Sequence, residues 1–170
     1  MLTSATSKQH QILILDAGPI RELVLFHAVS EFGFEKLRDD LRFIKDVESY
    51  NRCSEFVGTF SNRLTTSAGV VVELYHWIRD TEKHGQSRLW GRVYEQFRNM
   101  GMDEQVVQLV AMDSSLVLRC GPVDTSLLEI ARRHLARNPL VLTADWPFHW
   151  ECINSGVQVS HLDQIATRIA

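Results

Sequence analysis

Two aspartates each follow a short apolar run in this chain. Asp16 comes directly after Ile12–Leu15, and Asp145 follows Leu140–Thr143 after one alanine. Such runs are typical of strands that are buried on both faces of a parallel sheet. The carboxyl ends of parallel strands meet at one edge of the sheet, where ligands of open α/β folds bind. The sequence therefore predicts that Asp16 and Asp145 share a crevice at that edge.

Two further acids lie near predicted helix starts. Glu73 falls in the second turn of a helix predicted over Ala68–Asp80 with Ser67 as its N-cap, and Asp124 begins a helix predicted over Asp124–Arg137. Helices that follow parallel strands start at the edge where those strands end. A turn, a cap or a solvated helix face explains any one of these acids taken alone. The prediction of a site therefore depends on the four acids together.

Four carboxylates in one crevice repel one another, and some of them would take up protons. A divalent cation relieves this repulsion, and oxygen ligands favour Mg²⁺ or Mn²⁺ over zinc. Two such ions about 3.5–4 Å apart can activate water and stabilise the leaving oxygen of a phosphodiester. Thr143, two residues before Asp145, is predicted to orient Asp145 or a bound water; an ordinary strand residue is the alternative.

Several other side chains are candidates for contacts with a nucleic acid. Arg21, Arg132 and Arg133 could bind phosphates because their helices adjoin the acidic segments, and a solvated helix face is the alternative for each. Trp146 could stack on a base, with packing in the core as the alternative. His149 could face the crevice, with a packed or surface position as the alternative.

Composition and charge limit the class of protein. The chain has 170 residues, of which 45% are hydrophobic, and this suits one domain over residues 12–170. A net charge of -3 does not match the basic balance of a simple DNA-binding domain. Residues 1–11 are polar and are predicted to form a flexible tail without the apolar centre of a secretory signal. No apolar stretch approaches the roughly 20 residues that span a bilayer. Three widely spaced cysteines suggest no disulfide framework, and we expect a cytoplasmic protein.

Predicted strands alternate with predicted helices along the chain. This alternation indicates an α/β fold in which helices flank a central, mostly parallel sheet in three layers. The remaining predicted elements are a helix from Pro19 to near Gly33, a helix over Glu35–Tyr50, an irregular stretch over Asn51–Asn62, a strand over Arg63–Thr66, a helix over Ser87–Met100, a strand or buried helix over Val106–Met112, a helix from Pro147 to Gly156, and a strand over Val157–His161.

The four acidic segments, in this order, resemble the motifs of PIN domains. ILILDAGPI resembles the opening strand with its acid, and TTSAGVVVELYHWI resembles the second motif, with a glutamate on a helix after a short strand. GPVDTSLLEIARRH resembles the third motif, and PLVLTADWPFHWECINSGVQVSHL resembles the last strand, helix and strand. The resemblance extends over nearly the whole chain.

The resemblance implies a Mg²⁺- or Mn²⁺-dependent nuclease that cuts RNA, with Asp16, Glu73, Asp124 and Asp145 as its acidic site. Many small bacterial members resemble VapC toxins, which are often homodimers and are inhibited by a partner antitoxin protein. The chain departs from those compact toxins in its longer stretch from about Gly33 to Asn62. Its first motif also has Gly18 where an Asn or Ser often stands.

The sequence is also compatible with two functions other than a metal-dependent nuclease. One is a non-catalytic PIN-like module that binds RNA or a protein. The other is a different α/β enzyme, such as a phosphatase with an aspartyl nucleophile, which commonly carries a second acid two residues after the first. The glycine-rich loops of nucleotide-binding folds, GxGxxG and GxxxxGK[ST], do not occur in the chain.

Overall fold

Five parallel strands form one sheet in the part of the chain that the structure describes. This computed structural model describes residues 12–32, 35–82, 91, 95 and 98–167, so the predicted tail and most of the predicted helix at Ser87–Met100 lie outside it. The strand order is β3-β2-β1-β4-β5 with every pairing parallel, which confirms the predicted α/β class. The strands are β1 (Ile12–Leu15), β2 (Leu64–Ser67), β3 (Asp103–Gln105), β4 (Pro139–Thr143) and β5 (Val159–His161).

Strand β1 lies at the centre of the sheet, between β2 and β4. Leu13, Ile14 and Leu15 are completely buried, which explains why the strand shows no alternation of polar and apolar residues. Strand β4 pairs with β1 along its length, up to Leu15 opposite Leu142. Because the chain extends the sheet from β1 first in one direction and then in the other, a topological switch point lies between β1 and β4. Ligand crevices of open α/β sheets form at such points.

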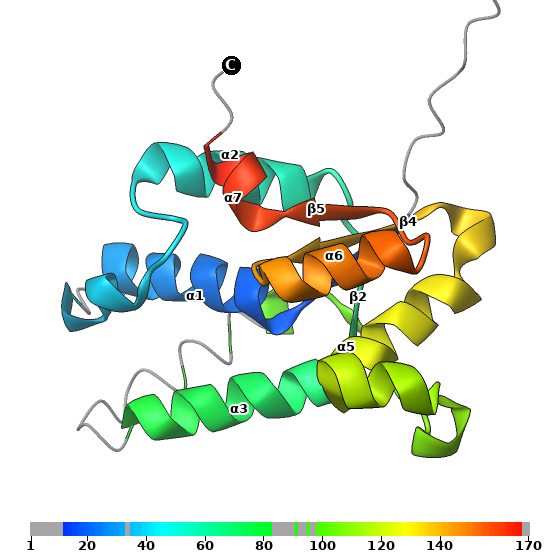
Figure 1. The fold of residues 1–170 in the computed structure, drawn as a ribbon. Coiled ribbons are helices and arrows are strands. Elements are labelled where there is room, and N and C mark those ends of the chain that lie inside the picture. Colours follow the sequence, from blue (N-terminus) through cyan, green and yellow to red (C-terminus); the bar gives the residue numbers. More distant parts are fainter. Residues whose placement is uncertain (1–11, 33–34, 83–90, 92–94, 96–97, 168–170) are drawn as a thin grey trace, which may run out of the picture.

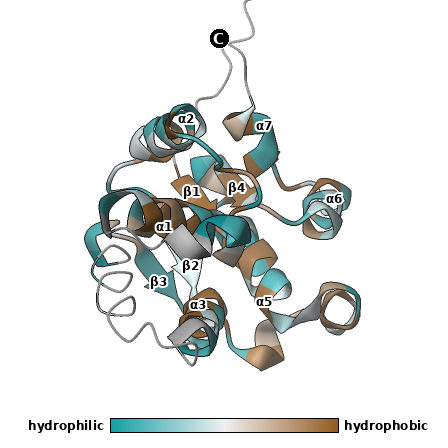
Figure 2. Ribbon diagram, turned by 90° about the vertical axis from the view of Figure 1, so that its left-hand side faces the viewer, coloured by the Kyte–Doolittle hydropathy of each residue, from teal (hydrophilic) through white to brown (hydrophobic). Residues whose placement is uncertain are grey.

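Helices flank the sheet on both faces (Figures 1 and 2). Helix α1 packs beside α2 and α3, and α5 packs beside α6. Right-handed crossovers produce this division when strands are added in opposite directions from β1. The short α7 packs on α2. The helices are α1 (Ala17–Phe32), α2 (Val47–Gly58), α3 (Ala68–Glu82), α5 (Ser114–Arg133), α6 (Trp146–Asn154) and α7 (Leu162–Ala166), with 3-10 turns η1 (Glu35–Asp40), η2 (Leu109–Ala111) and η3 (Leu135–Arg137).

The helix predicted over Glu35–Tyr50 is wrong, as is the irregular stretch predicted over Asn51–Asn62. The chain forms the turn η1, then an irregular stretch, and then α2. Asp46 starts α2 with a capping box, in which its side chain accepts from the N–H of Ser49 at 2.7 Å and the Ser49 hydroxyl accepts from the N–H of Asp46. Leu41 is buried as its spacing predicts, although the backbone around it is not helical.

The strand or buried helix predicted over Val106–Met112 is also wrong. This stretch holds the turn η2, and Val110 in it is 90% exposed. The edge strand β3 lies just before it and consists of the polar residues Asp-Glu-Gln, which carry no apolar signal. The helical segment from Ser114 to Cys120 and the short α7 were not predicted.

Two other features concern membrane-spanning helices and the state of the cysteines. No described helix has both the length and the apolar character needed to cross a membrane. Cys53, Cys120 and Cys152 are all free thiols, in agreement with the prediction that they form no disulfide framework.

Candidate functional site

A cleft of about 400 Å³ opens where β1 and β4 end. Asp16, Glu73, Asp124 and Asp145 all line it, although they come from four separate segments of the chain. The structure thus brings the four predicted acids to one place, at the switch point of the sheet. Their roles as catalytic residues and metal ligands stay predictions.

Asp16 is the most deeply placed of the four acids, with 7% of its surface exposed. Its Oδ1 accepts a hydrogen bond from the N–H of Ala17 at 2.6 Å, and its Oδ2 accepts one from the Thr143 hydroxyl at 2.7 Å. The same hydroxyl accepts from the N–H of Asp145 at 3.0 Å. Thr143 therefore connects the ends of β1 and β4 and fixes the orientation of Asp16. This contact to Asp16 goes beyond the role predicted for Thr143.

The first turn of α1 lies very close to the end of β4. A Cβ added at Gly18 would lie 2.6 Å from the Cβ of Ala144, a distance that carbon atoms of side chains do not adopt. Glycine at position 18 is therefore required for this close approach. The approach brings Asp16 and Asp145 to the same wall of the cleft.

Glu73 is placed by the start of α3. The Ser67 hydroxyl caps this helix by accepting from the N–H of Val70 at 3.3 Å, as the sequence predicts. A Cβ added at Gly69 would lie 3.1 Å from Val123, so the start of α3 packs tightly against the segment that carries Asp124. Glu73 itself is exposed on the cleft side of the helix.

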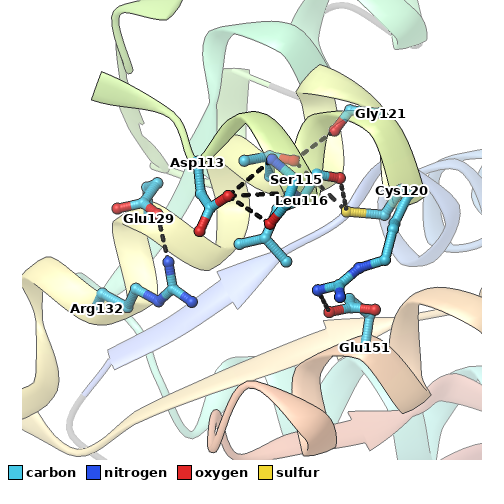
Figure 3. Close-up of polar contacts among 10 residues, drawn as sticks. Asp113, Ser115, Leu116, Cys120, Gly121, Glu129, Arg132 and Glu151 are labelled. Carbon is cyan, nitrogen blue, oxygen red and sulfur yellow. Dashed lines mark hydrogen bonds and ion pairs between the residues drawn. The ribbon is translucent and has the colours of Figure 1, made fainter. Parts of the chain in front are cut away.

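Helix α5 is broken at Gly121 (Figure 3). This break places Asp124. Gly121 has φ 85° and ψ 169°, a backbone conformation that essentially only glycine adopts. The second half of the helix starts after this break with Pro122, a favoured first residue. The Gly121 carbonyl accepts from the Thr125 hydroxyl at 2.7 Å. Asp124 therefore lies in the first turn of a new helical segment, facing the cleft.

Three of the four acids have a raised pKa. Burial, opposed by its two hydrogen bonds, raises the pKa of Asp16, and the charge of Asp145 raises it further. Burial and the charge of Asp16 raise the pKa of Glu73. Burial and the charges of the other three acids raise the pKa of Asp124 to about 8. The four carboxylates are therefore close enough to repel one another, as the sequence predicts.

The three arginines predicted to bind phosphates differ in their position relative to the cleft. Arg21 lines the cleft, and its guanidinium lies 5.8 Å from the ring centre of Trp77. Its Nε is buried without a hydrogen-bond partner. Arg132 instead pairs with Glu129 at 2.6 Å (Figure 3), and Arg133 is exposed on the same helix; neither lines the cleft. Only Arg21 of the three therefore stands beside the acids.

The predicted aromatic candidates lie outside the residues that line the cleft. The Trp146 ring stacks on the ring of His161, with 3.8 Å between the ring centres and 7° between the planes. His149 is 6% exposed and meets the edge of Trp146. Burial lowers the pKa of both histidines. His149 is therefore packed, in agreement with its alternative, whereas Trp146 is 39% exposed and is not a core residue, although its ring stacks on His161.

Two residues near the cleft escaped prediction. Glu22 is completely buried on α1, yet its spacing resembles that of any helical acid. Arg42 lines the cleft from the irregular stretch before α2, in a region that was predicted to be helical. The positions of Glu22 and Arg42 depend on tertiary contacts, which the spacing of residues in the sequence does not reveal.

The acids of the cleft suit a hard cation in chemistry, since all four offer carboxylate oxygens and three carry a raised pKa that a positive charge would lower. Across the described ranges, no three His, Cys, Asp or Glu side chains are already arranged to hold an ion.

Comparison with known proteins finds no protein-family model and no curated protein that matches this chain. Its function must be inferred from the residues of the acidic cleft.

Proposed function

We propose that this protein is a Mg²⁺- or Mn²⁺-dependent endoribonuclease that hydrolyses RNA phosphodiester bonds. One observation carries the proposal: Asp16, Glu73, Asp124 and Asp145 meet in one cleft at the switch point of the sheet. Gathering like charges is unfavourable unless a counter-charge is present. A cation explains why these acids lie together, and it makes the cleft compatible with a polyanion.

The residues that line the cleft would have separate roles in phosphodiester hydrolysis. A bound divalent cation would supply water of lowered pKa and would neutralise charge that develops on the phosphate. Asp16 is fixed by Thr143 and the backbone, so it offers a rigid ligand. Glu73 and Asp145 are exposed and can adjust to the cation and the substrate. Arg21 stands beside them, where its guanidinium can bind a phosphate oxygen.

The choice of RNA and of cellular partners comes from the resemblance to PIN domains. It supports RNA as the substrate, an antitoxin as an inhibitory partner protein and a homodimer as the assembly, whereas the proposed cytoplasmic setting comes from the three widely spaced cysteines. All four acids come from one chain, so the cleft forms without a second copy. The proposed activity therefore does not depend on the proposed dimer.

Specific observations disfavour the two alternatives. A module that only binds RNA or protein has no need to gather four carboxylates, three of which have a pKa raised by burial and by the charge of neighbouring acids. A phosphatase with an aspartyl nucleophile commonly needs a second acid at position 18. The close approach of Ala144 leaves no room for a side chain there.

The proposal is tested by cleavage of RNA by the wild-type protein and by Asp16→Asn, with Mg²⁺ or Mn²⁺ and with EDTA. We expect cation-dependent cleavage by the wild type and at least a hundredfold slower cleavage by the variant. Asp39→Asn is the matched control, since Asp39 is exposed and does not line the cleft. Equal cleavage by wild type and Asp16→Asn would refute the proposal.

A further inference from the structure

A buried carboxylate holds the irregular stretch between η1 and α2. Glu22, completely buried on α1, accepts hydrogen bonds from three successive backbone N–H groups: Arg42 at 2.9 Å, Phe43 at 3.0 Å and Ile44 at 3.1 Å. A charged acceptor makes such bonds stronger than those between neutral groups. The backbone at residues 42–44 is therefore fixed to the helix that follows Asp16.

The neighbours of Arg42 fix this stretch further. Leu41 and Ile44 are buried in the core. Phe43 packs against the edge of His161, with 5.3 Å between the ring centres. Arg42 alone in residues 41–44 is exposed, and it lines the acidic cleft. The contacts of Glu22 thus place one arginine at the rim of the cleft.

Arg21 and Arg42 line the acidic cleft, but neither forms an ion pair within the described part of the chain. An arginine that only neutralised the four acids would be expected to pair with one of them. These two guanidiniums instead remain available to an anion.

We infer that Arg42 binds a phosphate of the substrate other than the one that is cleaved, and that Glu22 is the positioning residue that holds it there. This inference rests on the proposed function and identifies the substrate class as an oligonucleotide chain, with at least one phosphate flanking the scissile bond. A substrate with a single phosphate gains nothing from Arg42.

The first test compares two substrates for wild type and Arg42→Ala. One is a single-stranded oligoribonucleotide, and the other is bis(p-nitrophenyl) phosphate, a diester with no second phosphate. For the oligoribonucleotide we expect a KM raised about five- to tenfold with little change in kcat. For the small diester we expect kcat/KM to be unchanged within about twofold. An equal loss on both substrates would overturn the inference.

The second test measures binding without cleavage, by fluorescence anisotropy of the labelled oligoribonucleotide with Ca²⁺ at low salt. Arg42→Ala should weaken binding about five- to tenfold and lower the slope of log affinity against log salt by about 0.7, and Arg42→Lys should restore the slope. The matched control is Arg137→Ala: Arg137 is exposed just before β4, at the opposite edge of the sheet from the cleft.

The role of Glu22 is tested by Glu22→Gln in the same assays. If Glu22 acts through Arg42, the double variant Glu22→Gln/Arg42→Ala binds the oligoribonucleotide no more weakly than Arg42→Ala. Additive losses would contradict the positioning role. Glu22→Gln should also leave hydrolysis of the small diester within about twofold of wild type.

The two proposals fail in different ways. A wild-type protein that cleaves neither substrate but binds the oligoribonucleotide through Arg42 refutes the nuclease and supports the phosphate contact. A wild-type protein that cleaves RNA, with Arg42→Ala binding and cleaving as well as wild type, supports the nuclease and refutes the contact. Absence of oligoribonucleotide binding by the wild type also refutes the contact.

Discussion

The hydroxyl of Thr143 donates a hydrogen bond to Oδ2 of Asp16 at 2.7 Å, across the boundary between β4 and β1. These residues lie 127 positions apart in the chain. Both are buried, so the bond is shielded from water. It makes the orientation of Asp16, the deepest acid, dependent on β4, the strand that precedes Asp145.

Thr143→Val should therefore lower both stability and activity. It removes the donor but keeps the shape, and leaves Oδ2 of Asp16 buried without a partner, which costs about 1–3 kcal/mol. Thermal unfolding and RNA cleavage measure the two effects, and Thr143→Ser, which keeps the hydroxyl, should retain most of both. A valine variant with wild-type cleavage would show that Asp16 needs no such support.

The acidic cleft should make the cation-free protein less stable as the pH rises. The pKa of Asp124 is about 8 in the folded chain against 3.8 for the ordinary side chain. Between these values the folded chain keeps a proton that the unfolded chain has released, so the free energy of unfolding falls with rising pH. The slope from this group is at most about 1.4 kcal/mol per pH unit, and solvent on its exposed side reduces it.

Asp124→Asn should flatten this dependence and raise the melting temperature near pH 8. Melting in EDTA across pH 4 to 8 measures the effect, and Asp39→Asn should keep the wild-type slope. A wild-type melting temperature that rises steadily over this range would contradict the raised pKa of Asp124.

Mn²⁺ should stabilise the wild-type protein against heat, because a cation that binds only the folded chain favours it. The gain is about 2.7 kcal/mol at a cation concentration about one hundred times Kd. Asp16→Asn and Asp145→Asn should lose most of this gain, since each removes a carboxylate of the cleft. The same stabilisation in all three proteins would place the cation elsewhere.

Gly18→Ala should destabilise the protein by about 1–3 kcal/mol, because its Cβ would collide with Ala144 and force the end of β1 away from β4. The rate of RNA cleavage by Gly18→Ala should also fall, since displacing the end of β1 displaces Asp16. Gly58→Ala is the matched control: nothing lies within 4 Å of a Cβ at this helical glycine, so the change should be neutral or stabilising. Equal melting temperatures for the two variants would contradict the close approach.

Much of the fold could be predicted because its central strands are apolar without interruption. The predicted strands Ile12–Leu15 and Leu140–Thr143 match β1 and β4 within one residue, and the predicted capping of α3 by Ser67 is confirmed. The four acids could be placed in one cleft because each follows a strand or starts a helix at the carboxyl edge. Sequence patterns of this kind report local geometry and burial directly.

The failures occurred where tertiary contacts outweigh local pattern. The spacing of Leu41 and Ile44 suggests a helix, and both residues are buried, but the N–H groups of residues 42–44 bond to Glu22 instead of to helical carbonyls. The sequence alone does not reveal these hydrogen bonds to Glu22. The break at Gly121 likewise divides one helical pattern into two, so the segment from Ser114 was missed.

The pairing of β1 with β4 has a consequence for the order in which the protein is made. Strand β1 is synthesised before β4, which pairs with it from Ile12 opposite Pro139 to Leu15 opposite Leu142 but follows it by more than a hundred residues. Until then Asp16 has neither its hydrogen bond to Thr143 nor Asp145 beside it. The nascent chain therefore carries a dispersed set of acids, and the chemistry of the cleft begins only once synthesis has passed residue 145.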